Sequence, residues 1–263
     1  MKRTLIVGNW KMHLDPQGAD LLVKRLNDRV KTHRDTEVVL APSLLTLQSV
    51  SEAADHHKFR LAAQNAFYKD EGAYTGEVSF TMLRGLAHYV IVGHSERRIY
   101  FEESLETIRD KVQAAVRNDL VPILCVGETK QERTAGETRR RVHDQIVTAL
   151  ANLTAEEVEN IAIAYEPIWA ISTFGGDLAK PDEVQAVLKF IRAQISELYG
   201  KKAGEAVRLL YGGSVSADTA GGYLVLDDCD GTLVGGESLN YHQFADIVET
   251  AQRLERPKEK ADG

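Results

Sequence analysis

Eight short runs of apolar residues recur along the chain and alternate with segments of helical periodicity. The runs are almost continuously hydrophobic, which is typical of parallel strands buried on both faces. They lie at residues 4–8, 37–41, 60–63, 89–93, 121–126, 161–165, 207–211 and 232–235. The spacing between successive runs leaves room for a strand, a helix and two loops each time, so the pattern predicts repeated βα units.

Apolar residues at helical spacing mark the segments between these runs. The first apolar face comprises Ala19, Leu22, Val23, Leu26 and Val30, and similar faces lie within residues 108–116 and 184–195. Asp15-Pro16 and Lys180-Pro181 are interpreted as helix starts, because proline suits the first turn of a helix. Lys180 is a poor capping residue, so the second boundary is less well defined than the first.

Eight βα units without a break in composition predict one α/β domain over residues 1–263, with a short charged tail at about 256–263. This length is common for a (β/α)8-barrel. The pattern also permits an open, doubly wound sheet, but the number of strands and their regular alternation with helices favour the closed barrel.

The net charge of −7 argues against nucleic acid and anionic membrane surfaces as partners. The apolar run at residues 5–7 is too short for a secretory signal, and no stretch approaches the roughly 20 apolar residues that span a bilayer. Cys125 and Cys229 form no CxxC pair, and no His cluster has metal-ligand spacing. We therefore expect a cytoplasmic protein without a metal site, in which local groups would have to attract any phosphate ligand.

Polar or glycine-rich residues follow nearly every apolar run. They are Asn9-Trp10-Lys11, Pro42-Ser43, Gln64-Asn65, His94-Ser95-Glu96, Gly127-Glu128, Glu166-Pro167, Gly212-Gly213-Ser214 and Gly235-Gly236. In a closed barrel the carboxyl ends of all strands meet at one rim, where the active sites of this fold lie. The sequence therefore predicts that these scattered residues form a single site.

Glu166 and His94 are the candidate acid–base residues of this site. A carboxylate in a partly desolvated pocket becomes a usable general base near neutral pH, although a Glu paired with a neighbouring Lys or Arg is the commoner case. His94 stands where a helix could begin, and helix amides beside the ring would keep it neutral and able to donate a hydrogen bond to a carbonyl oxygen. The plainer alternative is a hydrogen-bonded structural histidine.

Lys11 and two glycine pairs are the candidate phosphate-binding groups. Lys11 would supply the positive charge that the acidic chain lacks, although most lysines simply lie on a surface loop. Glycines let backbone amides approach a phosphate closely, and Gly212-Gly213 and Gly235-Gly236 end the seventh and eighth runs, where barrels frequently bind phosphate. One such pair can be an ordinary tight turn; two on adjacent strands are stronger evidence.

At this point the chain resembles the triosephosphate isomerase family, whose members are TIM-barrel enzymes. The motifs that carry the resemblance occur in the family's order along almost the whole chain. They span residues 8–12, 74–77, 90–98, 125–128, 165–170, 211–215 and 233–236.

The resemblance implies an isomerase of glycolysis and gluconeogenesis that interconverts D-glyceraldehyde 3-phosphate and dihydroxyacetone phosphate without a cofactor or metal. Glu166 would move a proton between adjacent carbons through an enediol(ate), His94 and Asn9 would polarise the oxygens, and Lys11 would stabilise the developing charge. The phosphate would be bound by Asn9, Lys11, Ser172, Ser214, Gly235 and Gly236. Glu96 and Cys125 would lie behind these residues.

The family resemblance also implies a homodimer, in which the third βα loop enters the neighbouring subunit's site. Here that loop is residues 65–77, with Thr75 at its tip. A loop this long on a compact barrel should be functional or docked, and Phe67 and Tyr68 are costly to leave in water. The alternative is an Ω-loop packed on its own barrel. We interpret Cys125 as an inert core thiol and Trp169 as an anchor of the sixth loop.

The sixth loop departs from the family pattern. Residues 170–181 read Ala-Ile-Ser-Thr-Phe-Gly-Gly-Asp-Leu-Ala-Lys-Pro, which lacks the family's usual lysine hinge and is longer. We expect Gly175-Gly176 to replace the hinge, since adjacent glycines absorb large backbone rotations. Two other functions are compatible with the fold: a different phosphate-binding barrel enzyme, which would not need Asn9, Lys11, His94 and Glu166 together, and a non-catalytic barrel scaffold, which would tend to lose the base or the electrophile.

Overall fold

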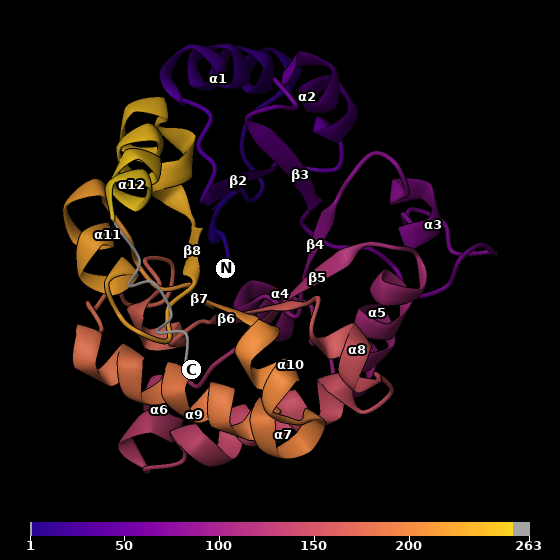
Figure 1. Cartoon of the computed structure of the whole chain (residues 1–263). Coiled ribbons are helices and arrows are strands. Elements are labelled where there is room, and N and C mark those ends of the chain that lie inside the picture. Colours follow the sequence, from indigo (N-terminus) through magenta and orange to yellow (C-terminus); the bar gives the residue numbers. More distant parts are fainter. Residues whose placement is uncertain (1, 255–263) are drawn as a thin grey trace.

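The computed structural model describes residues 2–254, and in this part of the chain eight parallel strands form a closed barrel (Figure 1). Each strand pairs with the next along the chain, and β8 pairs with β1. The strands are β1 (Thr4–Asn9), β2 (Thr36–Ala41), β3 (Phe59–Ala63), β4 (Tyr89–Val92), β5 (Val121–Val126), β6 (Ala162–Tyr165), β7 (Arg208–Tyr211) and β8 (Gly231–Val234). The prediction of a closed barrel is confirmed, and each predicted run overlaps one strand. The predicted tail at 256–263 lies outside the described residues.

Helices surround the barrel, as Figure 1 shows. They are α1 (Pro16–Arg29), α2 (Leu47–Ala53), α3 (Phe80–Leu83), α4 (Ser95–Tyr100), α5 (Leu105–Arg117), α6 (Lys130–Thr134), α7 (Thr138–Leu150), α8 (Ala155–Val158), α9 (Pro181–Tyr199), α10 (Lys201–Ala206), α11 (Ala217–Leu224) and α12 (Tyr241–Arg253), with 3-10 turns η1 (Ile168–Ala170) and η2 (Gly236–Leu239). The apolar faces predicted for α1 and α9 are buried. Val30, the last residue of the first face, is also buried but lies just after the end of α1.

The two predicted helix starts at proline are confirmed and are capped differently. The Asp15 side chain accepts a hydrogen bond from the Gly18 amide at 2.8 Å, which satisfies one of the free amides of the first turn of α1. The Lys180 side chain does not cap α9. Instead the Glu183 carboxylate accepts a hydrogen bond from the Lys180 amide at 3.2 Å, so an acid in the first turn fixes this start.

Burial on both faces explains why the strands are continuously apolar. Leu5 and Val7 point into the barrel with residues such as Ile91 and Leu210, whereas Ile6 packs in the second core between barrel and helices. Gly231 in β8 has a φ of +155°, and a Cβ there would lie 1.9 Å from the carbonyl oxygen of Leu5. Glycine therefore permits the closure of β8 on β1.

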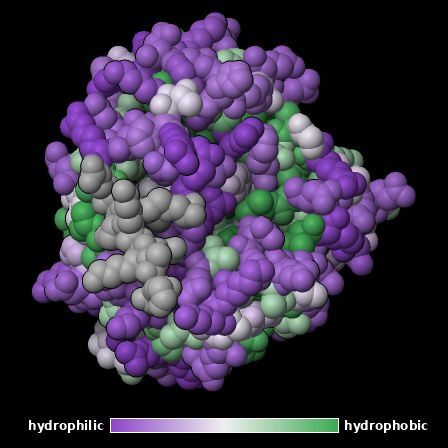
Figure 2. All heavy atoms as spheres, viewed as in Figure 1, coloured by the Kyte–Doolittle hydropathy of each residue, from purple (hydrophilic) through white to green (hydrophobic). Residues whose placement is uncertain are grey.

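The face seen in Figure 1 is mostly hydrophilic, and the apolar side chains visible on it gather around β4, β5 and α5 (Figure 2). None of the helices in residues 2–254 is both long and apolar enough to cross a membrane.

Candidate active site

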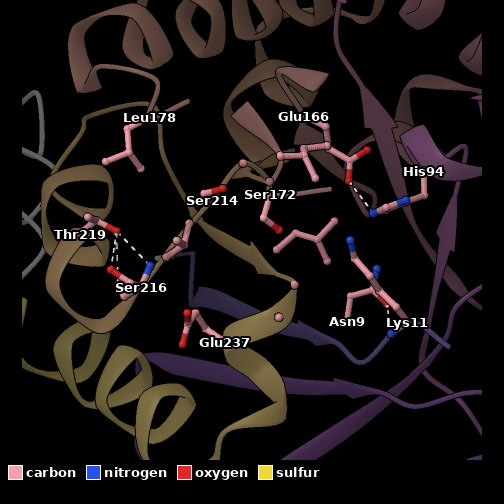
Figure 3. A pocket seen from close by; sticks show the side chains of 17 residues that line it. Asn9, Lys11, His94, Glu166, Ser172, Leu178, Ser214, Ser216, Thr219 and Glu237 are labelled. Atoms are coloured by element: carbon pink, nitrogen blue, oxygen red, sulfur yellow. Dashed lines mark hydrogen bonds and ion pairs between the residues drawn. The ribbon is translucent and has the colours of Figure 1, made fainter. Parts of the chain in front are cut away.

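A cavity of about 180 Å³ lies at the carboxyl ends of the strands (Figure 3). The structure brings eight of the predicted site residues together in its lining: Asn9, Lys11, His94, Glu166, Ser172, Ser214, Gly235 and Gly236. They come from the ends of β1, β4, β6, β7 and β8 and from the sixth loop. The expectation that strand ends far apart in the sequence form one site therefore agrees with the geometry.

Glu166 directly follows β6 and is 2% exposed. Its carboxylate Oε2 accepts a hydrogen bond from the Ser95 amide at 3.0 Å, and its Oε1 lies 3.1 Å from Nε2 of His94. No hydrogen bond of good geometry reaches Oε1 from the described residues, and no Lys or Arg among them forms an ion pair with this carboxylate. The alternative of an ordinary Lys–Glu or Arg–Glu pair is not what the structure shows.

The backbone of Gly127 is pressed against that of Glu166. A Cβ on Gly127 would lie 1.9 Å from the carbonyl oxygen of Glu166, so only glycine fits between the ends of β5 and β6. The Glu166 amide also donates to the carbonyl oxygen of Val126 at 2.7 Å. The base candidate is thus fixed through its backbone as well as its carboxylate.

His94 stands at the N-terminus of α4 with its ring against the first helical amides. Its Nδ1 accepts a hydrogen bond from the Glu96 amide at 3.3 Å. A nitrogen that accepts from an amide carries no proton, so a neutral ring has its proton on Nε2, the nitrogen that faces Glu166. This tautomer can donate a hydrogen bond to a carbonyl oxygen in the cavity, which supports the neutral electrophile over a purely structural histidine.

Lys11 is held at the rim in a left-handed backbone conformation, with a φ of +53°. Its amide donates to Oδ1 of Asn9 at 3.0 Å, and its carbonyl oxygen accepts from the Gln64 side chain at 2.8 Å. Its Nζ donates to Glu96 at 2.6 Å and to the Thr173 hydroxyl at 3.2 Å. Lys11 is therefore a positioned cation and not a free surface lysine.

Glu96 lies behind Lys11 and outside the cavity lining, as expected. Burial by itself would raise the pKa of Glu96, but the hydrogen bond from Lys11 and nearby positive charge outweigh burial, and the pKa is lowered. The ionised carboxylate therefore balances the ammonium group of Lys11.

The glycine pairs and Ser214 line the same cavity as Glu166. Gly212 lies beside the base candidate, since a Cβ on it would be 2.9 Å from Cγ of Glu166. The amide and hydroxyl of Ser214 both donate to the carbonyl oxygen of Ala170, at 3.0 and 2.8 Å. A Cβ on Gly235 would come within 3.8 Å of Nζ of Lys11, so this glycine lies beside the cation. Backbone amides and one cation thus occur together, which is what binding of a phosphate requires.

The lining also contains residues that the sequence analysis did not single out. Ser216 and Thr219 bond each other at the start of α11, and Leu178 and Glu237 point toward the same end of the cavity (Figure 3). Ser216 lies two residues after Ser214, the last of the polar residues predicted at the end of the seventh strand. The signal that could have identified it is therefore its position just beyond a strand end.

The sixth loop is anchored at its N-terminal end through Trp169. The indole Nε1 donates to Oε1 of Glu128 at 3.0 Å, and the ring lies under the guanidinium group of Arg133, 4.4 Å from its centroid. Burial raises the pKa of Glu128, although hydrogen bonds from Trp169 and Tyr165 act against this. The interpretation of Trp169 as an anchor agrees with these contacts, which the sequence did not reveal because Glu128 lies on another strand end.

Two predicted residues lie away from the cavity. Cys125 points into the barrel core, where burial raises the pKa of its thiol well above the usual value, so it is an inert core residue. Thr75 is exposed on the segment between β3 and α3, which extends away from the barrel (Figure 1). Within residues 2–254 no group of three or more His, Cys, Asp or Glu side chains is arranged to hold a metal ion.

Comparison with known proteins adds independent evidence. A sequence model of the triosephosphate isomerase family matches residues 4–251. The triosephosphate isomerase of Chloroherpeton thalassium is 42% identical over 254 residues, which cover 96% of this chain and 100% of that protein. The triosephosphate isomerase of Caldanaerobacter subterraneus subsp. tengcongensis is 45% identical over 249 residues, covering 94% and 99%, and that of Carboxydothermus hydrogenoformans is 44% identical over 250 residues, covering 95% and 99%.

Proposed function

The chain belongs to the triosephosphate isomerase family, and from this premise we propose that Glu166, His94, Lys11 and Asn9 perform the interconversion of D-glyceraldehyde 3-phosphate and dihydroxyacetone phosphate. The observation that carries the assignment of roles is the approach of the buried Glu166 carboxylate to Nε2 of His94, 3.1 Å apart, on the wall of a cavity that also contains a positioned lysine.

The unpaired Oε1 of Glu166 is the atom that removes the proton. It takes the proton from C1 of dihydroxyacetone phosphate, and the electrons of that C–H bond form the C1–C2 double bond while the carbonyl electrons move to O2. His94 Nε2–H and the ammonium group of Lys11 stabilise the oxyanion of this enediolate. The proton of the O1 hydroxyl passes through His94 to O2, Glu166 returns its own proton to C2, and O1 becomes the aldehyde oxygen. Substrate must first displace the contact between Glu166 and His94.

The phosphate group lies beside Ser214, Gly235 and Gly236. Amides at Ser172, Gly235 and Gly236 bind its oxygens, and Lys11 supplies the positive charge. The Ser214 amide, which donates to the carbonyl oxygen of Ala170 in this structure, joins them when that hydrogen bond breaks. These local groups outweigh the net charge of −7 because they act at short range in a partly enclosed site. Neither a cofactor nor a metal takes part in the proposed reaction.

The sixth loop closes over the bound phosphate, and we place its C-terminal hinge at Gly175-Gly176. Gly176 has a φ of +68°, and residues 172–178 are largely exposed between two buried positions, Ile171 and Ala179. A pair of structures with and without a phosphate analogue tests this. Rotation of the backbone at these glycines is expected, and unchanged dihedral angles there would contradict the assignment.

A coupled assay for interconversion of the two triose phosphates tests the proposed function directly. Glu166→Gln keeps the size of the side chain but removes the base, so we expect kcat to fall by about 10³-fold or more, while binding of a phosphate analogue is retained. If the Glu166→Gln variant isomerises the substrate as fast as the unaltered chain, Glu166 is not the base. An unaltered chain that binds phosphate but does not isomerise would indicate another phosphate-binding barrel enzyme or a scaffold.

A homodimer completes the proposal, together with a cytoplasmic location. Met12 is 94% exposed, Leu45 79% and Met82 65%, and such apolar side chains around one rim mark a protein interface. Phe67 packs against Tyr68 and Tyr74, with ring centroids 4.5 and 4.6 Å apart, and stiffens the protruding segment that carries Thr75.

Light scattering measures the assembly. The unaltered chain is expected to have the mass of a dimer, whereas Thr75→Arg should yield monomers of low activity, because it would place a charge in the neighbour's pocket. A wild-type chain that is monomeric at micromolar concentration and fully active would overturn the dimer and leave the catalytic assignment intact.

A further inference from the structure

Tyr223 connects the C-terminal end of the sixth loop to the phosphate-binding end of the cavity. It lies in α11, is 3% exposed, and its hydroxyl donates to the carbonyl oxygen of Ala179 at 2.8 Å. Ala179 is itself 2% exposed and directly precedes Lys180 and Pro181, where α9 begins. This hydrogen bond therefore fixes the point at which the exposed loop returns to the barrel.

The ring of Tyr223 also packs against the end of β7. It stacks on the ring of Tyr211 with centroids 4.2 Å apart and an interplanar angle of 28°. Tyr211 immediately precedes Gly212-Gly213, and a Cβ on Gly213 would lie only 2.2 Å from its hydroxyl oxygen. The Tyr211 side chain thus packs against the glycine pair, and the ring of Tyr223 packs against Tyr211. A change in the position of the Tyr223 ring would therefore alter the packing on the backbone that would hold the phosphate.

The two ends of the loop are anchored in the same manner but from different strands and helices. At the N-terminal end, Trp169 donates to the buried Glu128. At the C-terminal end, the Tyr223 hydroxyl donates to the carbonyl oxygen of Ala179. The neighbouring Gly222 lies near Pro181, since a Cβ on Gly222 would be 3.9 Å from Cγ of that proline. The residues between the anchors are mostly exposed, so their path on closure depends on where the anchors stand.

We propose that Tyr223 is a positioning residue for the isomerisation, which fixes the C-terminal anchor of the sixth loop, at Ala179, relative to the Gly212-Gly213 pair. The proposal rests on the proposed function, because the loop must cover the enediolate for the position of its anchor to matter. Tyr223 touches no substrate atom; it acts through the carbonyl of Ala179 and the ring of Tyr211.

A loosened anchor has a specific chemical consequence. The enediolate with its charge on O1 and its proton on O2 loses its phosphate when it is not covered: the electron pair on O1 forms the C1 carbonyl, the C1–C2 pair moves to C2–C3, and the C3–O bond breaks with its electrons going to the departing inorganic phosphate. The remaining enol gains a proton at C3 and loses one from O2, which gives 2-oxopropanal. The share of substrate that follows this route reports on how well the loop covers the intermediate.

The test compares Y223F with Y199F, a matched control. The Tyr199 hydroxyl donates to the carbonyl oxygen of Leu150 at 2.6 Å, away from the cavity, so both variants lose one tyrosine-to-carbonyl hydrogen bond. With dihydroxyacetone phosphate as substrate, isomerisation is followed by a coupled assay, and the side reaction by release of inorganic phosphate and 2-oxopropanal.

We expect Y223F to raise the share of phosphate loss by about fivefold, as one hydrogen bond allows, and Y199F to leave it within about twofold of the wild type. Y223L, which also removes the stack on Tyr211, should raise the share further. The proposal would be overturned if the share of substrate that loses phosphate were the same in Y223F and Y223L as in Y199F. If Y223F proves unstable, the comparison of Y223L with Y199F decides. A wild-type chain without isomerisation would instead contradict the proposed function itself.

Discussion

The two ends of the barrel differ in how completely their buried ionisable side chains are paired. At the N-terminal end, Arg208 at the start of β7 donates to the Glu37 carboxylate at 2.8 Å and to the Tyr89 hydroxyl at 2.7 Å, so three strand beginnings are joined by a paired network. At the carboxyl-terminal end, Oε1 of Glu166 and the hydroxyl of Tyr211 are buried without a hydrogen-bond partner among the described residues.

This difference separates stability from chemistry within one fold. Paired groups at the N-terminal end close the barrel and gain nothing from a ligand, whereas unpaired groups at the other end carry a free-energy cost that a substrate can relieve. In (β/α)8-barrels the catalytic residues come from the carboxyl ends of the strands, and the opposite end serves stability. The comparison therefore predicts that substitutions at the two ends affect different measurements.

Lys11→Met should have the largest effect and should act on activity alone. Lys11 is the only Lys or Arg among the described residues that line the cavity, so the substitution removes the charge that attracts the phosphate and stabilises the enediolate. We expect kcat/KM to fall by about 10³-fold, with a thermal midpoint close to that of the wild type. A large loss of stability with normal turnover in the folded fraction would show that Lys11 belongs with the structural end.

Arg208→Met should have a smaller effect and should act on stability alone. Removing the guanidinium group leaves Glu37 and the Tyr89 hydroxyl without their partner, so we expect the free energy of unfolding to drop by about 2 to 4 kcal/mol while kcat of the folded enzyme is retained. Denaturant unfolding and the coupled assay measure the two quantities.

The double variant Arg208→Met with Glu37→Gln provides the control for this substitution. It removes the stranded carboxylate as well and should be less destabilised than Arg208→Met alone. Equal losses in the single and double variants would show that the pair itself contributes little, and a loss of kcat in either variant would break the separation of the two ends.

The sequence predicted the strands well because their signal is local. Burial on both faces leaves a run of apolar residues that needs no knowledge of the partners. Most strands differ from the prediction by one residue at one or both ends, and some of these differences lie at glycines. The predicted fourth run includes Gly93, but its φ of +70° ends β4 at Val92, whereas the predicted eighth run omits Gly231, which pairs with Leu5 in β8. Glycine carries no side chain that reports which of these a position requires.

The residues of the site were predictable for a different reason, since a closed barrel brings every strand end to one rim whatever the distance along the chain. Contacts between side chains were not. Arg208 lies 171 positions from Glu37, and Tyr223 lies 44 positions from Ala179, with no motif linking either pair. Tyr223 also occupies an apolar position of its helix, so the sequence pattern favours a simple core role, and only the folded arrangement shows where its hydroxyl donates.

The smallest expected effect concerns the N-terminal end at alkaline pH. Burial raises the pKa of Tyr89 to about 12, although the charge of Arg208 acts to lower it. Because this value lies above the roughly 10 of an unfolded tyrosine, the folded chain holds the phenolic proton more tightly. The resulting stabilisation is present in full below pH 10 or so and is lost as the pH rises through about 12, a change on the order of 2 kcal/mol.

Other tyrosines and lysines titrate in the same range, so the measurement is the difference in unfolding free energy between the wild type and Tyr89→Phe at each pH. That difference should shrink from pH 10 to pH 12. A constant difference would mean that Tyr89 keeps an ordinary pKa and that the N-terminal end is less tightly closed than its hydrogen bonds indicate.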